Sequence, residues 1–182
     1  MARTRIALCS GVAIVTLAAF AVVQAASQNG SAPSLYSIKE LMDSVVDPSA
    51  DDVWGAVGTV VDKVEGIKEM VPKTEEEWAA VRRASVRLAE AGNLLAMPGR
   101  KTAPPGTKSE TPGVELEPEE MDALIAANRR GFENFARALN GIGSELVRAA
   151  DEKNPDKILD IGARMEDICE TCHQTFWYPP KK

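Results

Sequence analysis

The 182-residue sequence predicts an all-α protein, an antiparallel four-helix bundle. Apolar residues recur with helical spacing in four segments, three of them long and amphipathic. Aromatic residues make up only 5% of the chain, so the core must consist mainly of Ala, Val, Ile, Leu and Met, which suits helices better than sheets. An antiparallel bundle is the simplest way to bury four such apolar stripes.

The first predicted helix begins after Ser37, which has capping-box spacing with Glu40. Pro48 lacks an amide proton and restricts the residue before it, so we expect it to end or kink this helix. Asp47 or Ser49 can then cap a second short stretch. The first stretch carries one apolar stripe, formed by Ile38, Leu41, Met42 and Val45.

The second predicted helix spans about residues 75–97 and starts with another capping box, Thr74 with Glu77. The segment before it, residues 57–71, is rich in glycine and β-branched residues. That composition leaves two alternatives, an irregular segment or a small hairpin around residues 62–66.

Residues 98–117 contain four of the eleven prolines and predict a solvated loop that is mobile and takes no part in a binding site. The third predicted helix has proline at its first position, Pro118, and runs to about residue 152. Its small residues Gly131, Gly141 and Gly143 either admit a flat ligand or a neighbouring helix, or reflect ordinary close packing.

The fourth predicted helix begins at Asn154-Pro155 and leads into Cys169-Glu170-Thr171-Cys172-His173, which has the C-x-x-C-H pattern of c-type haem attachment. Two thiols three residues apart lie on the same side of a helix, so both can add to the vinyl groups on one edge of a haem. His173, the only histidine in the chain, is then held beside the ring as the proximal iron ligand. The motif therefore predicts one covalent haem c at Cys169 and Cys172.

Other interpretations of the two cysteines have less support. A structural zinc site needs four ligands, and no second cluster of cysteine or histidine exists in the sequence. A thioredoxin-like site would open a helix after a strand, whereas this motif closes a helix. A disulfide across two intervening residues would close only a very short loop and contribute little stability. If the cysteines do form one, the remaining interpretation of the protein is a helical interaction module.

The N-terminal residues 1–25 are typical of a secretory signal peptide, with a basic start at Arg3 and Arg5, an apolar run, and a small-residue cleavage site before Ala26. We expect cleavage there and a periplasmic location; an uncleaved membrane anchor is the rival interpretation. Cys9 follows a bulky leucine and is interpreted as a residue of the apolar run. Residues 26–34 form a flexible lead to the bundle at 35–178.

Removing Arg3 and Arg5 from the 21 basic residues leaves 19 against 27 acidic residues, a net charge near −8 for the mature chain. This charge argues against binding to nucleic acid or anionic lipid and permits a basic partner. No hydroxyl or thiol nucleophile has a free histidine to pair with, so we expect no enzymatic activity.

A C-terminal C-x-x-C-H on the last helix of an exported four-helix protein resembles the class II c-type cytochromes, cytochrome c-prime and its low-spin relatives. The resemblance covers residues 35–178 and is most specific at Cys169 to Phe176. It implies thioether bonds at both cysteines, His173 as proximal ligand, and a first helix that faces the other side of the iron. It also implies a homodimer.

The same resemblance offers two residues for the distal side, Leu41 and Met42. If Met42 binds the iron, the protein is a six-coordinate electron carrier that exchanges electrons with redox partner proteins. If an apolar side chain only covers the iron, the protein is a five-coordinate binder of a diatomic gas such as nitric oxide or carbon monoxide. We expect the electron carrier and keep gas binding as the alternative.

Overall fold

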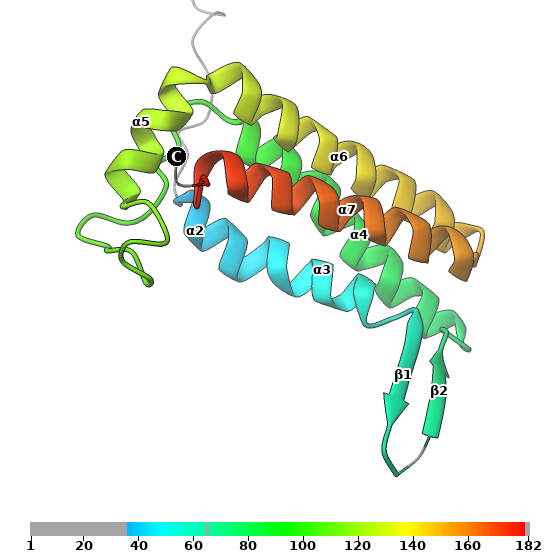
Figure 1. Ribbon diagram of the computed structural model, residues 1–182. Coiled ribbons are helices and arrows are strands. Elements are labelled where there is room, and N and C mark those ends of the chain that lie inside the picture. The colour runs from blue at the N-terminus through cyan, green and yellow to red at the C-terminus, as the bar shows by residue number, and fades with distance from the viewer. Residues whose placement is uncertain (1–35, 65, 181–182) are drawn as a thin grey trace, which may run out of the picture. The chain divides into compact units, whose positions relative to one another are not determined.

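The structure is a computed structural model that describes residues 36–64 and 66–180 (Figure 1). The expected signal peptide, Cys9 and the flexible lead lie outside these residues. The described part of the chain is mostly helical, as the sequence predicted, and contains one two-stranded antiparallel sheet. None of the helices in this part combines the length and the apolar composition that a membrane span requires.

The first helical segment is continuous, so the prediction that Pro48 could end it is wrong. The chain runs from α2 (Ile38–Leu41) through a π-helical turn, η1 (Met42–Val46), into α3 (Asp47–Trp54) without a side-chain cap at the junction. The wider π-helical turn includes Ser44, whose carbonyl the Pro48 ring would press against in a regular α-helix. The predicted capping box at Ser37 and Glu40 is confirmed.

A β-hairpin links this segment to the next helix. Strands β1 (Gly58–Asp62) and β2 (Gly66–Met70) pair antiparallel, which settles the alternatives for residues 57–71 in favour of the hairpin. Helix α4 (Glu75–Ala96) follows, and its first turn is closed by the predicted box, in which the Glu77 amide donates to Thr74 Oγ1 at 3.2 Å.

The third predicted helix is two helices, α5 (Pro118–Ala127) and α6 (Arg129–Asp151). The chain leaves the helical conformation at Asn128, with φ −128° and ψ 47°, and the Asn128 side chain accepts a hydrogen bond from the Gly131 amide at 3.2 Å. A side-chain amide that caps the following turn makes this break favourable. The prediction of one helix over 118–152 is therefore wrong at Asn128.

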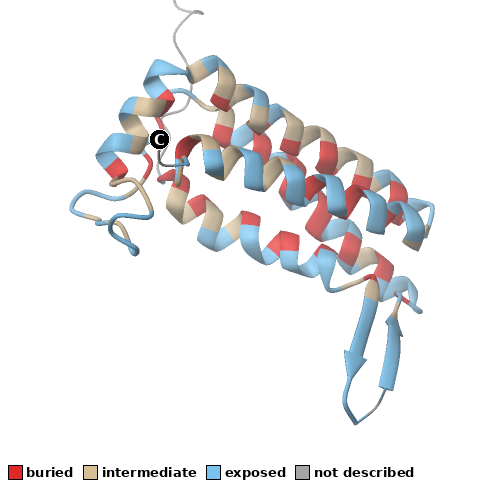
Figure 2. Ribbon diagram, in the orientation of Figure 1, coloured by how far each residue is buried: buried red, intermediate tan, exposed pale blue. Residues whose placement is uncertain are grey.

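The last helix, α7 (Pro155–Phe176), starts as predicted, with the Asn154 side chain accepting from the Lys157 amide at 3.0 Å. Successive long helices run in opposite directions (Figure 1), and contacts join α3 to α4, α4 to α6, α6 to α7 and α7 back to α3. Their buried faces meet in one core (Figure 2). Its largest fully buried apolar side chains are Val53, Leu88, Leu146, Ile158 and Met165.

Hydrogen bonds join the loop between α4 and α5 to α2, α5 and the end of α7. The Ile38 and Lys39 amides of α2 donate to the carbonyls of Lys101 and Thr102, both at 2.8 Å. The Thr102 hydroxyl donates to Asp122 of α5 at 2.9 Å. The Leu116 amide donates to the carbonyl of Trp177 at 2.9 Å, just past the end of α7. The loop therefore lies against the ends of α2 and α7.

Candidate functional site

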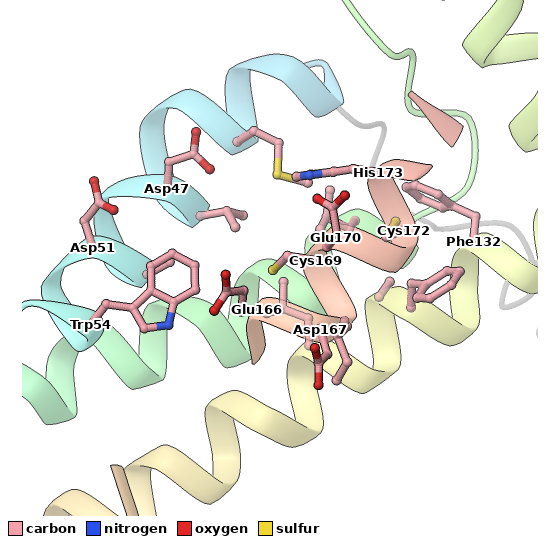
Figure 3. A pocket seen from close by; sticks show the side chains of 18 residues that line it. Asp47, Asp51, Trp54, Phe132, Glu166, Asp167, Cys169, Glu170, Cys172 and His173 are labelled. Atoms are coloured by element: carbon pink, nitrogen blue, oxygen red, sulfur yellow. The ribbon is translucent and has the colours of Figure 1, made fainter. Parts of the chain in front are cut away.

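The last two turns of α7 bring the C-x-x-C-H residues to one cavity. Cys169, Cys172 and His173 all line a cavity of about 550 Å³ (Figure 3). Both cysteines are free thiols and both are half-buried. Residues at i, i+3 and i+4 share a helix face, which is why the motif spacing places two sulfurs and an imidazole at one opening.

The wall that faces α7 belongs to η1 and α3. Met42 and Val46 come from η1, and Asp47, Ala50 and Trp54 come from α3. Trp54 also holds the two walls in register, because its indole Nε1 donates to the Gly162 carbonyl of α7 at 3.1 Å. The floor is apolar and consists of Leu95 from α4 and Phe132, Phe135, Ala136 and Leu139 from α6.

A second cavity of about 200 Å³ adjoins the first on the side of the α4–α5 loop. The two cavities share Met42, Asp47, Phe132, Cys172 and His173. Loop residues 102–103, 107–110 and 115 line the smaller cavity. The hydrogen bonds of this loop to α2 and α7 thus bring it beside His173, and whether the loop takes part in a binding site stays a prediction.

The structure separates the two residues that the sequence offered for the distal side. Met42 lines both cavities together with His173. Leu41 is buried in the core and is among the lining residues of neither cavity. Of the two candidates for the distal side, only Met42 lines the cavities that hold the motif residues.

Aromatic side chains fix the end of α7. Phe176 is buried and packs edge-on against Phe132, with ring centroids 5.5 Å apart, and against Phe135 at 6.2 Å. The Trp177 ring lies edge-on to the His173 imidazole at 5.1 Å. These contacts limit how the last turn can move and so help to orient His173.

Burial controls the protonation of the motif residues. It raises the pKa of Cys169 to about 11 and that of Cys172 to about 12, and at Cys169 the neighbouring Asp47 carboxylate adds to the shift. Burial lowers the pKa of His173, although Glu170 and Asp47 oppose this shift. The uncharged imidazole that results is the form that can donate an electron pair to a metal.

Charge is distributed unequally between the two cavities. The described residues that line the larger cavity include no lysine or arginine and five acidic residues: Asp47, Asp51, Glu166, Asp167 and Glu170 (Figure 3). The smaller cavity is lined by Lys39 and Lys108 as well as by acidic residues, and by the hydroxyl residues Thr107 and Ser109. Cationic and hydroxyl groups are the partners that carboxylates of a bound ligand require.

The donor set fits a haem. Two free thiols at the attachment spacing, an uncharged imidazole and a thioether opposite it line one largely apolar cavity. The volume lies within the ordinary range of cofactor sites. Within residues 36–64 and 66–180, no three His, Cys, Asp or Glu side chains are grouped so that they could bind a metal ion.

Sequence reasoning did not find several residues of the site. Trp54 and Phe135 line the larger cavity, yet in the sequence they are ordinary apolar positions of a helical stripe. The loop residues of the smaller cavity carry no motif at all. These residues reach the site through contacts between distant segments, which spacing along one helix does not reveal.

No protein-family model matches the chain, and no curated protein or solved structure is significantly similar to it.

Proposed function

We propose that this chain is an exported c-type haem protein that works in the periplasm as a soluble electron carrier. Its helices would form the antiparallel four-helix bundle of the class II cytochromes, with one haem c held by Cys169 and Cys172. The observation that carries the proposal is that both thiols and the only imidazole of the chain line one cavity, with the Met42 thioether on the opposite wall.

Each residue would have a defined task. Cys169 and Cys172 anchor the cofactor covalently to α7, His173 offers an uncharged imidazole nitrogen to the iron, and Met42 offers sulfur from η1. When bound, the haem supplies one-electron chemistry between ferrous and ferric iron. The apolar floor from α6 limits the access of water, and two ligands fixed on packed helices keep the coordination unchanged between oxidation states.

Gas binding remains the second candidate because Met42, on the proposed distal side, also lines the cavity of about 200 Å³, which has room for a diatomic molecule. It requires that Met42 only covers the iron. The two functions therefore differ in one bond, from the Met42 sulfur to the iron.

Visible spectra of the exported protein, recorded before and after addition of carbon monoxide, test both candidates. We expect low-spin bands that carbon monoxide leaves unchanged, as six-coordinate iron requires. A high-spin spectrum that shifts with carbon monoxide would replace the electron carrier by the gas-binding function. A chain that carries no covalent haem would refute both and leave the helical interaction module.

A further inference from the structure

The β1–β2 hairpin exposes apolar side chains that its own fold leaves uncovered. Val61 and Ile67 lie opposite each other on one face and are 76% and 75% exposed. Val60, which lies opposite Lys68 on the other face, is 43% exposed. The hairpin extends away from the helices (Figure 1) and is exposed along nearly its whole length (Figure 2). Two strands alone are marginally stable in water, and a third strand is the usual remedy.

We propose that β1 pairs with β1 of a second copy of this chain and forms a four-stranded antiparallel sheet. The two-fold axis would pass beside Val60, so that Val60 of one copy lies opposite Val60 of the other. Thr59 would then lie opposite Val61 of the other copy, and Gly58 opposite Asp62. Every residue of the five-residue strand gains a partner in this register.

The charges on the two strands favour pairing through β1 and disfavour pairing through β2. A two-fold register centred on Lys68 would set two lysines face to face, and one centred on Glu69 would oppose two glutamates. Like charges directly opposite each other destabilise a sheet. A register centred on Ile67 avoids both pairs but joins only residues 66–68. The β1 register joins five residues from each copy and opposes no like charges.

The expected dimer is weak, because an interface made by two short strands lies at the lower end of interface sizes. Sedimentation equilibrium of the exported protein should show a reversible monomer–dimer equilibrium below about 1 mM, which is the weak limit for a specific contact. A mass of one chain throughout this range would overturn the proposal.

Two substitutions at the axis test the register. In Val60→Glu the new carboxylate lies opposite Lys68 of its own hairpin, so the hairpin keeps a favourable cross-strand pair, but two carboxylates meet at the axis. We expect the dimer dissociation constant to rise at least about tenfold. Val60→Thr keeps a β-branched, uncharged residue and should stay within about threefold of the unsubstituted chain. Equal dimerisation of the two variants would contradict the proposed register.

Cross-linking gives a readout that does not depend on affinity. Residues directly opposite across a strand pair have Cβ atoms about 5 Å apart, so Val60→Cys should give a disulfide-linked dimer under mild oxidation. Lys68→Cys, on the strand away from the axis, should give no more covalent dimer than the unsubstituted chain. Cross-linking through position 68 and not through position 60 would assign the contact to β2 and overturn the proposal. Neither result depends on whether the chain carries a haem.

Discussion

The proposed function depends most on Met42. This residue is part of the π-helical turn η1 and lines both cavities together with His173, whereas its neighbour Leu41 is buried in the core. π-Helical turns inside α-helices occur often at functional sites. The extra residue in the turn changes which side chains of the following helix face α7, so Met42 and α3 line the same cavity.

Substitution of Met42 by leucine tests its role as a ligand. Leucine has a similar volume and no donor atom, so we expect a low-spin spectrum to become high-spin while covalent haem is retained. Leu41→Met is the matched control, because a thioether at the buried position should leave the spectrum unchanged. A Met42→Leu spectrum identical to that of the unsubstituted protein would remove Met42 as a ligand.

A second prediction concerns the reactivity of the two motif thiols. Burial raises the pKa of Cys169 to about 11 and that of Cys172 to about 12, and only the thiolate reacts with alkylating agents. In haem-free protein at pH 8, iodoacetamide should therefore modify Cys169 roughly 100-fold more slowly than in denaturant.

The pH dependence of the alkylation rate distinguishes a raised thiol pKa from steric blockage of the thiol. A raised pKa means that the thiolate fraction, and with it the rate, should rise about tenfold per pH unit up to pH 10 or beyond. An ordinary cysteine would level off near pH 9. Mass spectrometry of Cys172→Ser measures Cys169 alone. A plateau near pH 9 would show that the thiol is not in the apolar environment described.

At the scale of helices, the contact between α4 and α6 depends on glycine. A Cβ atom at Gly143 would lie 2.4 Å from the Ala89 amide nitrogen of α4, and the Asn140 side chain donates to the Ala89 carbonyl at 2.8 Å. A Cβ atom at Gly141 would have no neighbour within 4 Å. Of the alternatives that the sequence left for these glycines, Gly143 thus admits a neighbouring helix.

Alanine substitutions at these two positions should therefore act in opposite directions. Gly143→Ala should lower the free energy of unfolding by about 1–3 kcal/mol, because α4 backbone must move away. Gly141→Ala should raise the free energy of unfolding by up to about 1 kcal/mol, because alanine has a higher helix propensity than glycine and its Cβ atom would contact no neighbouring atom. Urea denaturation followed by circular dichroism measures both. Equal effects at the two positions would contradict the close contact.

Local signals predicted helix starts well and interruptions poorly. Three helices begin at the N-cap residues that the sequence indicated, Ser37, Thr74 and Asn154. Each of these side chains accepts a hydrogen bond from a backbone amide in the first turn of the helix that follows it. Of the two outcomes expected at Pro48, an end or a kink, the end is wrong, because the helical segment continues through the π-helical turn into α3. The break at Asn128 was missed, although an asparagine three residues before a glycine was its available signal.

For the whole molecule, the structure places the motif at a junction of distant segments. The cavity walls come from η1 and α3 near one end of the described chain and from α7 near the other, with α6 beneath them. The spacing of the motif predicted which residues of α7 would share a face, because that is a property of one helix. The partners of that face depend on packing between helices, so only the structure identified Trp54, Phe135 and the α4–α5 loop.

The intact mass of the exported protein tests the central claim most directly. We predict a chain that begins at Ala26 and carries the additional mass of one haem, with the haem on the peptide that contains Cys169 and Cys172. Cys169→Ser combined with Cys172→Ser should abolish the added mass. An exported chain with two unmodified thiols, or with a disulfide between them and no added tetrapyrrole, would contradict the account.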